Sequence, residues 1–99
     1  MKANVFLGKI EVDVGFREPG GIIINKPISF DVSCTDSHYV AVPLCSAADR
    51  RLANLPEALE FTIEANKAQS LRGIKEGNLQ VIMDIVSTMQ KEELISISV

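Results

Sequence analysis

The residues best suited to chemistry lie close together in the first half of the chain: Cys34, His38 and Cys45, the two cysteines and the one histidine among 99 residues. Thiolates and imidazoles bind transition metals and form nucleophile–base pairs. Their spacing, Cys-x3-His-x6-Cys, matches no common zinc arrangement. The strand pattern described below also puts the two thiols roughly 15 Å or more apart, too far for a disulfide. We therefore expect no metal site and two buried, inert thiols.

The segment from Thr35 to Tyr39 carries an acid, a hydroxyl, an imidazole and a phenol in succession. A catalytic triad needs groups that converge from different directions, whereas neighbours in a hairpin loop usually point apart. Asp36 and Ser37 are also residues that turns use to bond their own backbone. The segment is therefore interpreted as a structural loop, with no catalytic residue.

Lys26 is the exception on an otherwise apolar strand face. Its ammonium group must reach water, pair with a carboxylate or meet a ligand, because burying it bare would cost several kcal/mol. An alternative hypothesis therefore groups Lys26 with Asp36, His38 and Tyr39 as ligand-binding residues of a pocket between sheet and helices. The acidic residues Glu57, Glu60 and Glu64 would form a solvated helix face.

Apolar residues alternate at period two through the first half of the chain, which predicts three strands that bury one face. All of these residues are even-numbered: Ile10, Val12, Val14, Phe16, Ile22, Ile24, Ile28, Phe30, Val32, Cys34, Val40, Val42 and Leu44. A five-residue loop over 17–21 would pair Phe16 with Ile22, and another over 35–39 would pair Cys34 with Val40. We also expect bulges or kinks at Lys26-Pro27 and near Gly8.

The second half changes to helical spacing. Ser46 to Asp49 has the form of a capping box and predicts a short helix. Asn54-Leu55-Pro56-Glu57 repeats a capping signal, which favours a helix to about Arg72, although residues 58–65 also alternate like a strand. Asn78 is expected to cap an amphipathic helix through Leu79, Ile82, Met83, Val86 and Met89 or Gln90. Residues 94–99 alternate again and predict a last strand.

Together these elements predict one α+β domain over residues 1–99. It is an antiparallel sheet of three to four strands, a β-meander first and the terminal strand last, with two to three helices packed on one face. Apolar runs are too short to span a bilayer and the start lacks a signal-peptide core, so we expect a cytoplasmic protein with no membrane association.

Composition narrows the function only by exclusion. The formal net charge is −3, and basic and acidic residues mix along the whole chain, which argues against nucleic-acid binding. The chain lacks tryptophan and a phosphate-binding glycine loop, and we expect no cofactor. This favours a small non-catalytic accessory protein that binds another protein or itself, as a homodimer or other homo-oligomer. The alternative is a small-molecule-binding protein or minor enzyme with a pocket between sheet and helices.

Overall fold

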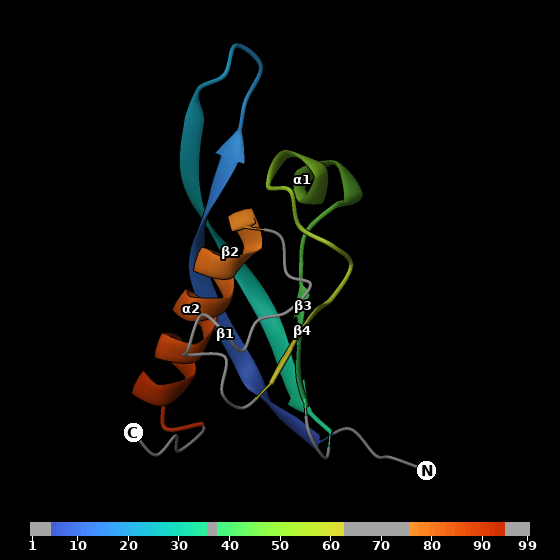
Figure 1. The fold of residues 1–99 in the computed structure, drawn as a ribbon, viewed down its shortest axis with the longest axis vertical. Coiled ribbons are helices and arrows are strands. Elements are labelled where there is room, and N and C mark those ends of the chain that lie inside the picture. The colour runs from blue at the N-terminus through green and yellow to red at the C-terminus, as the bar shows by residue number, and fades with distance from the viewer. Residues whose placement is uncertain (1–4, 36–37, 63–75, 95–99) are drawn as a thin grey trace.

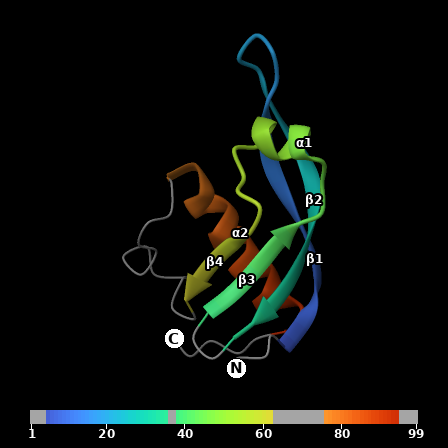
Figure 2. The ribbon, with the colours of Figure 1, turned by 90° about the vertical axis from the view of Figure 1, so that its right-hand side faces the viewer.

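The computed structural model describes residues 5–35, 38–62 and 76–94, and it has an α+β architecture (Figure 1). One antiparallel sheet contains four strands in the order β1-β2-β3-β4. The elements, in chain order, are β1 (Val5–Arg17), β2 (Ile23–Cys34), β3 (His38–Pro43), α1 (Ala47–Leu52), β4 (Leu59–Thr62) and α2 (Glu76–Lys91). Figure 2 shows α2 against one side of this sheet and α1 near the end from which the β1–β2 hairpin extends.

The predicted alternation in β1 is confirmed. Ile10, Val12, Val14 and Phe16 are at most 5% exposed, and the residues between them face solvent. The hairpin register differs from the predicted one by two residues, because Phe16 pairs with Ile24 and Ile10 pairs with Phe30. A shift of two keeps every side chain on its predicted face.

The turn of this hairpin uses its proline and glycines. The Gly21 N–H donates to the Glu18 carbonyl oxygen over 3.1 Å, and Gly20 has a φ of +93°. Pro19 followed by a residue with positive φ is the arrangement of a type II turn, which glycine adopts without steric cost.

The two predicted irregularities have different outcomes. The ladder slips between Phe6 and Gly8, as expected for a bulge at Gly8. A bulge at Lys26-Pro27 was the wrong expectation, because Lys26 pairs with Val14 and Pro27 with Asp13 in unbroken register. The backbone nitrogen of Pro27 points away from β1, toward the side of β2 on which β3 lies. Because the pairing with β3 ends at Phe30, no ladder hydrogen bond is lost at Pro27, and the proline is tolerated.

The predicted pairing of β2 with β3 is wrong by one residue. Cys34 pairs with Tyr39 and Phe30 with Pro43, so the connection has four residues where five were expected. A shift of one residue exchanges the two faces of a strand. The buried residues of β3 are therefore Tyr39, Ala41 and Pro43, while the residues predicted to be buried turn the other way: Val40 is half-buried, and Val42 and Leu44 are 38% and 43% exposed.

The short helix α1 begins as predicted, since the Ser46 side chain accepts a hydrogen bond from the Asp49 N–H. Asn54, however, ends this helix and does not begin another. Its φ is +54°, and the Leu55 N–H donates to the Arg50 carbonyl oxygen over 2.8 Å, which is the Schellman pattern of a helix C-terminus.

The helix expected after Pro56 is wrong where the structure describes it, because Leu59–Thr62 forms strand β4. Leu59 and Phe61 are at most 3% exposed and stand opposite Ala41 and Tyr39. The Tyr39 and Phe61 rings lie 5.5 Å apart. The open edge of β3 and this buried pair favour the strand over the helix. The rest of the expected helix, to Arg72, lies outside the described residues.

The amphipathic helix α2 is confirmed and supplies most of the cover for the sheet. Its buried residues are Asn78, Val81, Ile82, Ile85, Val86 and Met89, and its packing is against β1. Asn78 is not the cap that was expected, since the helix already includes Glu76. It is 6% exposed, and its Oδ1 has no hydrogen-bond partner within the described part of the chain. The expected last strand, residues 94–99, lies beyond the described residues except for Leu94.

Neither α1 nor α2 has the length and apolar content needed to cross a bilayer, so the described part of the chain contains no candidate membrane-spanning helix.

The register of β3 can be tested with a pair of lysine substitutions. Ala41 is fully buried and Val42 is 38% exposed, opposite Asp31. Ala41→Lys should lower the free energy of unfolding by about 3 kcal/mol or more, because it places a charge in the core, and Val42→Lys should change it by less than about 0.5 kcal/mol. Urea denaturation measures both. A larger loss for Val42→Lys would contradict the observed register.

Candidate functional site

Of the four residues of the alternative ligand-binding hypothesis, the structure describes Lys26, His38 and Tyr39, and it places Lys26 far from the other two. Lys26 pairs with Val14, whereas Tyr39 pairs with Cys34, eight residues further along β2 and about 26 Å away at ~3.3 Å per residue. His38 begins β3 beside Thr62. Asp36 lies outside the described residues. A pocket that uses Lys26 together with His38 and Tyr39 has no geometric support.

Lys26 reaches solvent along an aromatic ring. Its Nζ lies 5.2 Å from the centre of the Phe16 ring and 3.5 Å from the Glu18 Oε1, and its side chain is 49% exposed. The lysine stem therefore covers Phe16 while the ammonium group stays hydrated, which is the ordinary arrangement of a lysine on an apolar face.

Cys45 lies apart from Cys34 and His38. Cys34 and His38 belong to the turn end of the β2–β3 pair, and Cys45 follows its opposite end, past the Phe30–Pro43 pair. Both cysteines are free and half-buried. Among the described residues, no three His, Cys, Asp or Glu side chains are placed to hold a metal ion.

The titratable groups with altered pKa values are shifted away from reactivity at neutral pH. Burial raises the pKa of the Tyr39 phenol, and the charge of the Cys34 thiolate raises it further. Burial also raises the pKa of the Cys45 thiol; the Asp49 carboxylate adds to this shift, and the Arg50 guanidinium partly offsets it. Both groups remain protonated near pH 7, so neither is an activated base or nucleophile.

One surface feature is the extension of the β1–β2 hairpin, residues 17–26, which we call the arm. Figure 1 shows the arm projecting past α1, away from the rest of the described chain. Ile22, Ile23 and Ile24 follow one another at its tip and are 64%, 61% and 43% exposed. The sequence pattern had predicted Ile22 and Ile24 as core residues. They are exposed because the hairpin continues beyond the part of the sheet that the helices cover.

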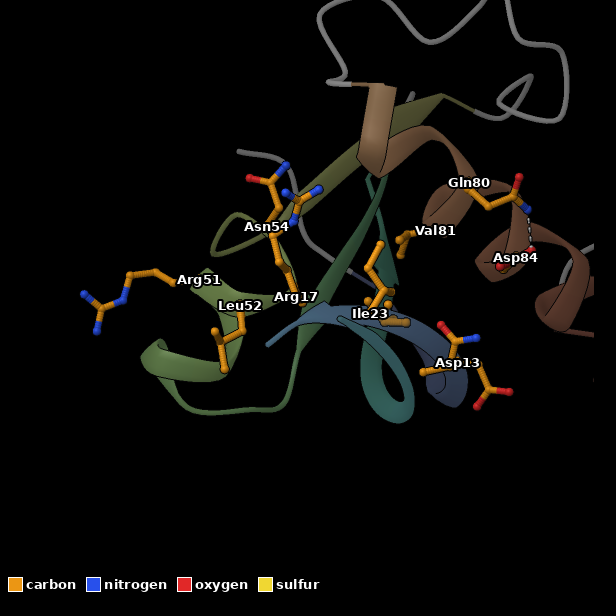
Figure 3. Close-up of a pocket in the computed structure, with 13 residues that line it drawn as sticks. Asp13, Arg17, Ile23, Arg51, Leu52, Asn54, Gln80, Val81 and Asp84 are labelled. Atoms are coloured by element: carbon orange, nitrogen blue, oxygen red, sulfur yellow. Dashed lines mark hydrogen bonds between the residues drawn. The ribbon is translucent and has the colours of Figure 1, made fainter. Parts of the chain in front are cut away.

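A second feature is a groove of about 870 Å³ at the base of the arm (Figure 3). Its walls come from the end of α1, the first half of α2 and both strands of the hairpin. The lining residues are Asp13, Val14, Gly15, Arg17, Ile23, Asn25, Arg51, Leu52, Ala53, Asn54, Gln80, Val81 and Asp84. Its size falls within the range of roughly 300–1,000 Å³ that is usual for ligand sites.

The charges of this groove are separated. Figure 3 shows Arg51 and Arg17 toward the α1 side, and Asp13 and Asp84 toward the α2 side. Asp84 is held by a 2.9 Å hydrogen bond that the Gln80 Nε2 donates to its Oδ1. The arrangement suits a ligand that is negative at one end and positive at the other. Sequence reasoning missed the groove, because residues from four separate elements build it and no local motif marks them.

No known protein family matches the chain, and no curated protein or solved structure is significantly similar to it.

The altered environment of Cys45 predicts slow alkylation. In a Cys34→Ser variant, which leaves Cys45 as the remaining thiol, the rate of reaction with iodoacetamide should rise with pH along a curve whose midpoint lies above that of the urea-unfolded protein, because less thiolate is present at each pH. Mass spectrometry of timed samples measures the rate. A midpoint at or below the unfolded value would show that Cys45 is activated.

Proposed function

We propose that the protein is a small non-catalytic accessory protein that acts through a protein–protein surface, and that the arm is this surface. The observation that carries the proposal is the exposure of three consecutive isoleucines at the tip of a projecting hairpin. Complete burial of a fully exposed isoleucine side chain contributes about 1.5–3 kcal/mol, and these three side chains still expose roughly half of their surface or more. Clustered exposed apolar residues of this kind mark interaction sites in soluble proteins.

The tip is apolar on both faces. Ile23 and Ile24 are successive residues of β2 and therefore point to opposite sides, and Ile22 directly precedes them at the turn. A flat partner would cover only one of these faces. The arm therefore suits a partner that encloses it, or a second arm that packs beside it.

Self-association is the form of this function that needs no further component. A symmetric dimer uses the same patch on both copies, and two apolar arms would supply both sides of such an interface.

Sedimentation velocity from low micromolar to submillimolar concentration tests the proposal. The wild-type protein should show a concentration-dependent dimer, and the combined variant Ile22→Thr, Ile23→Thr, Ile24→Thr should weaken it at least about tenfold, since about 1.4 kcal/mol is a factor of ten. Threonine keeps the strand preference of these positions. The matched control replaces three exposed aliphatic residues outside the arm, Val5, Val42 and Leu44, by threonine.

Equal weakening by both triple variants would refute a specific role for the arm. A protein that stays monomeric over the whole range would refute self-association. If that monomer also gained melting temperature with one metabolite from a panel, the groove would be favoured as a small-molecule site.

A further inference from the structure

The groove runs along an open strand edge. Val14 and Gly15 both line it, although their side-chain positions belong to opposite faces of the sheet. A single groove can touch both faces only at the edge of the strand. Figure 1 shows how this occurs: the strands of the hairpin cross, so that the upper part of β1 turns toward α1 while β2 lies on the far side.

The hydrogen-bond pattern shows which backbone groups lie at that edge. The Glu18 N–H donates to the Ile22 carbonyl oxygen over 2.8 Å, so this is a hydrogen-bonded pair, and such pairs alternate with non-bonded ones along an antiparallel ladder. The observed register therefore directs the even-numbered residues of β1 toward β2. The N–H and C=O groups of Asp13, Gly15 and Arg17 point the other way, and no described strand pairs with them.

The geometry points to a peptide-binding site in which an extended segment of a partner protein adds to the edge of β1, between α1 and α2. Strand addition needs unpaired backbone groups along an exposed strand and side-chain pockets beside it. Asp13, Gly15 and Arg17 supply the first, and the helix residues of the groove supply the second. Gly15, at the centre, carries no side chain, and the Ile23 and Asn25 side chains of β2 lie over its outer face, 3.2 Å and 3.5 Å from where a Cβ would stand.

The charged residues of the groove determine the order of charges that a bound peptide should have. Arg17 and Arg51 lie toward one end of the groove, and Asp13 and Asp84 toward the other. Asp13 and Arg17 are four residues apart, about 13 Å along the strand at ~3.3 Å per residue. A peptide antiparallel to β1 would place an acidic residue opposite Arg17 and a basic residue four positions later, opposite Asp13. The partner segment is thus extended, acidic first and basic second.

The capped peptide acetyl-Thr-Glu-Val-Thr-Val-Lys-Thr-amide is a suitable probe, titrated into the full-length ¹⁵N-labelled protein. The amide signals of Gly15 and Arg17 should shift and saturate. Exchanging the Glu and Lys of the peptide should weaken binding several-fold, because both charge pairs then become repulsive.

Methylation of single peptide nitrogens separates strand addition from side-chain binding without altering the protein. The central threonine of the probe lies opposite Gly15, so its N–H faces β1, and the neighbouring valine N–H faces away. N-methylation of the threonine should weaken binding at least about tenfold, because it removes one hydrogen bond and leaves its partner unsatisfied. N-methylation of the valine should change the affinity less than about twofold.

Equal effects of the two methylations, shifts confined to other parts of the protein, or no saturable shift at millimolar peptide would each overturn the inference. The peptide-binding site at the edge of β1 is independent of the proposed function. Self-association through the arm is measured by sedimentation without any peptide, so either proposal can fail while the other stands.

Discussion

The structure depends on the burial of one face of β1. Its even-numbered apolar residues pack beneath α2, and this contact fixes which way every residue of the strand points. Since the same residues also form hydrogen bonds with β2, the odd-numbered residues are left with their side chains on the outer face and their backbone groups at the open edge. The core, the polar outer surface and the groove at the base of the arm all follow from this single arrangement.

Much of this first hairpin can be predicted from the sequence, because a strict alternation in β1 and β2 allows one buried face only. A register that differs by two residues does not alter that result. The neighbouring pair shows the limit of the reasoning. Val40 and Val42 are as apolar as Tyr39 and Ala41, so the pattern of β3 fits either face, and the shorter connection buries the odd-numbered set. A local pattern cannot distinguish registers that differ by one residue when both faces carry apolar side chains.

The misassigned segment at β4 has a related cause. Leu59 and Phe61 alternate, but the Asn54-Leu55-Pro56 sequence also fits the start of a helix. In the structure Asn54 adopts a positive φ and closes α1, and the segment that follows pairs with the free edge of β3. The choice between helix and strand for this segment is decided by its tertiary contacts with Tyr39 and Ala41 of β3. The exposure of the arm could not be predicted from the sequence either. Ile22 and Ile24 continue the alternation of the core residues, but no described helix covers them.

The distinctive features of the described structure lie on its surface. An arm with an apolar tip and a charged groove meet at the same hairpin, whereas Cys45 lies at the opposite end of the β2–β3 pair from the turn that holds Cys34 and His38. The open edge of β1 is the feature on which the geometry of the groove depends.

Residue-resolved hydrogen exchange tests that edge most directly. In the free protein, the amides of Val12, Val14 and Phe16 should exchange slowly, because they bond to β2, and those of Asp13, Gly15 and Arg17 should exchange quickly, because they face the groove. Uniform protection of all six amides, or slow exchange at the odd-numbered positions, would contradict the account.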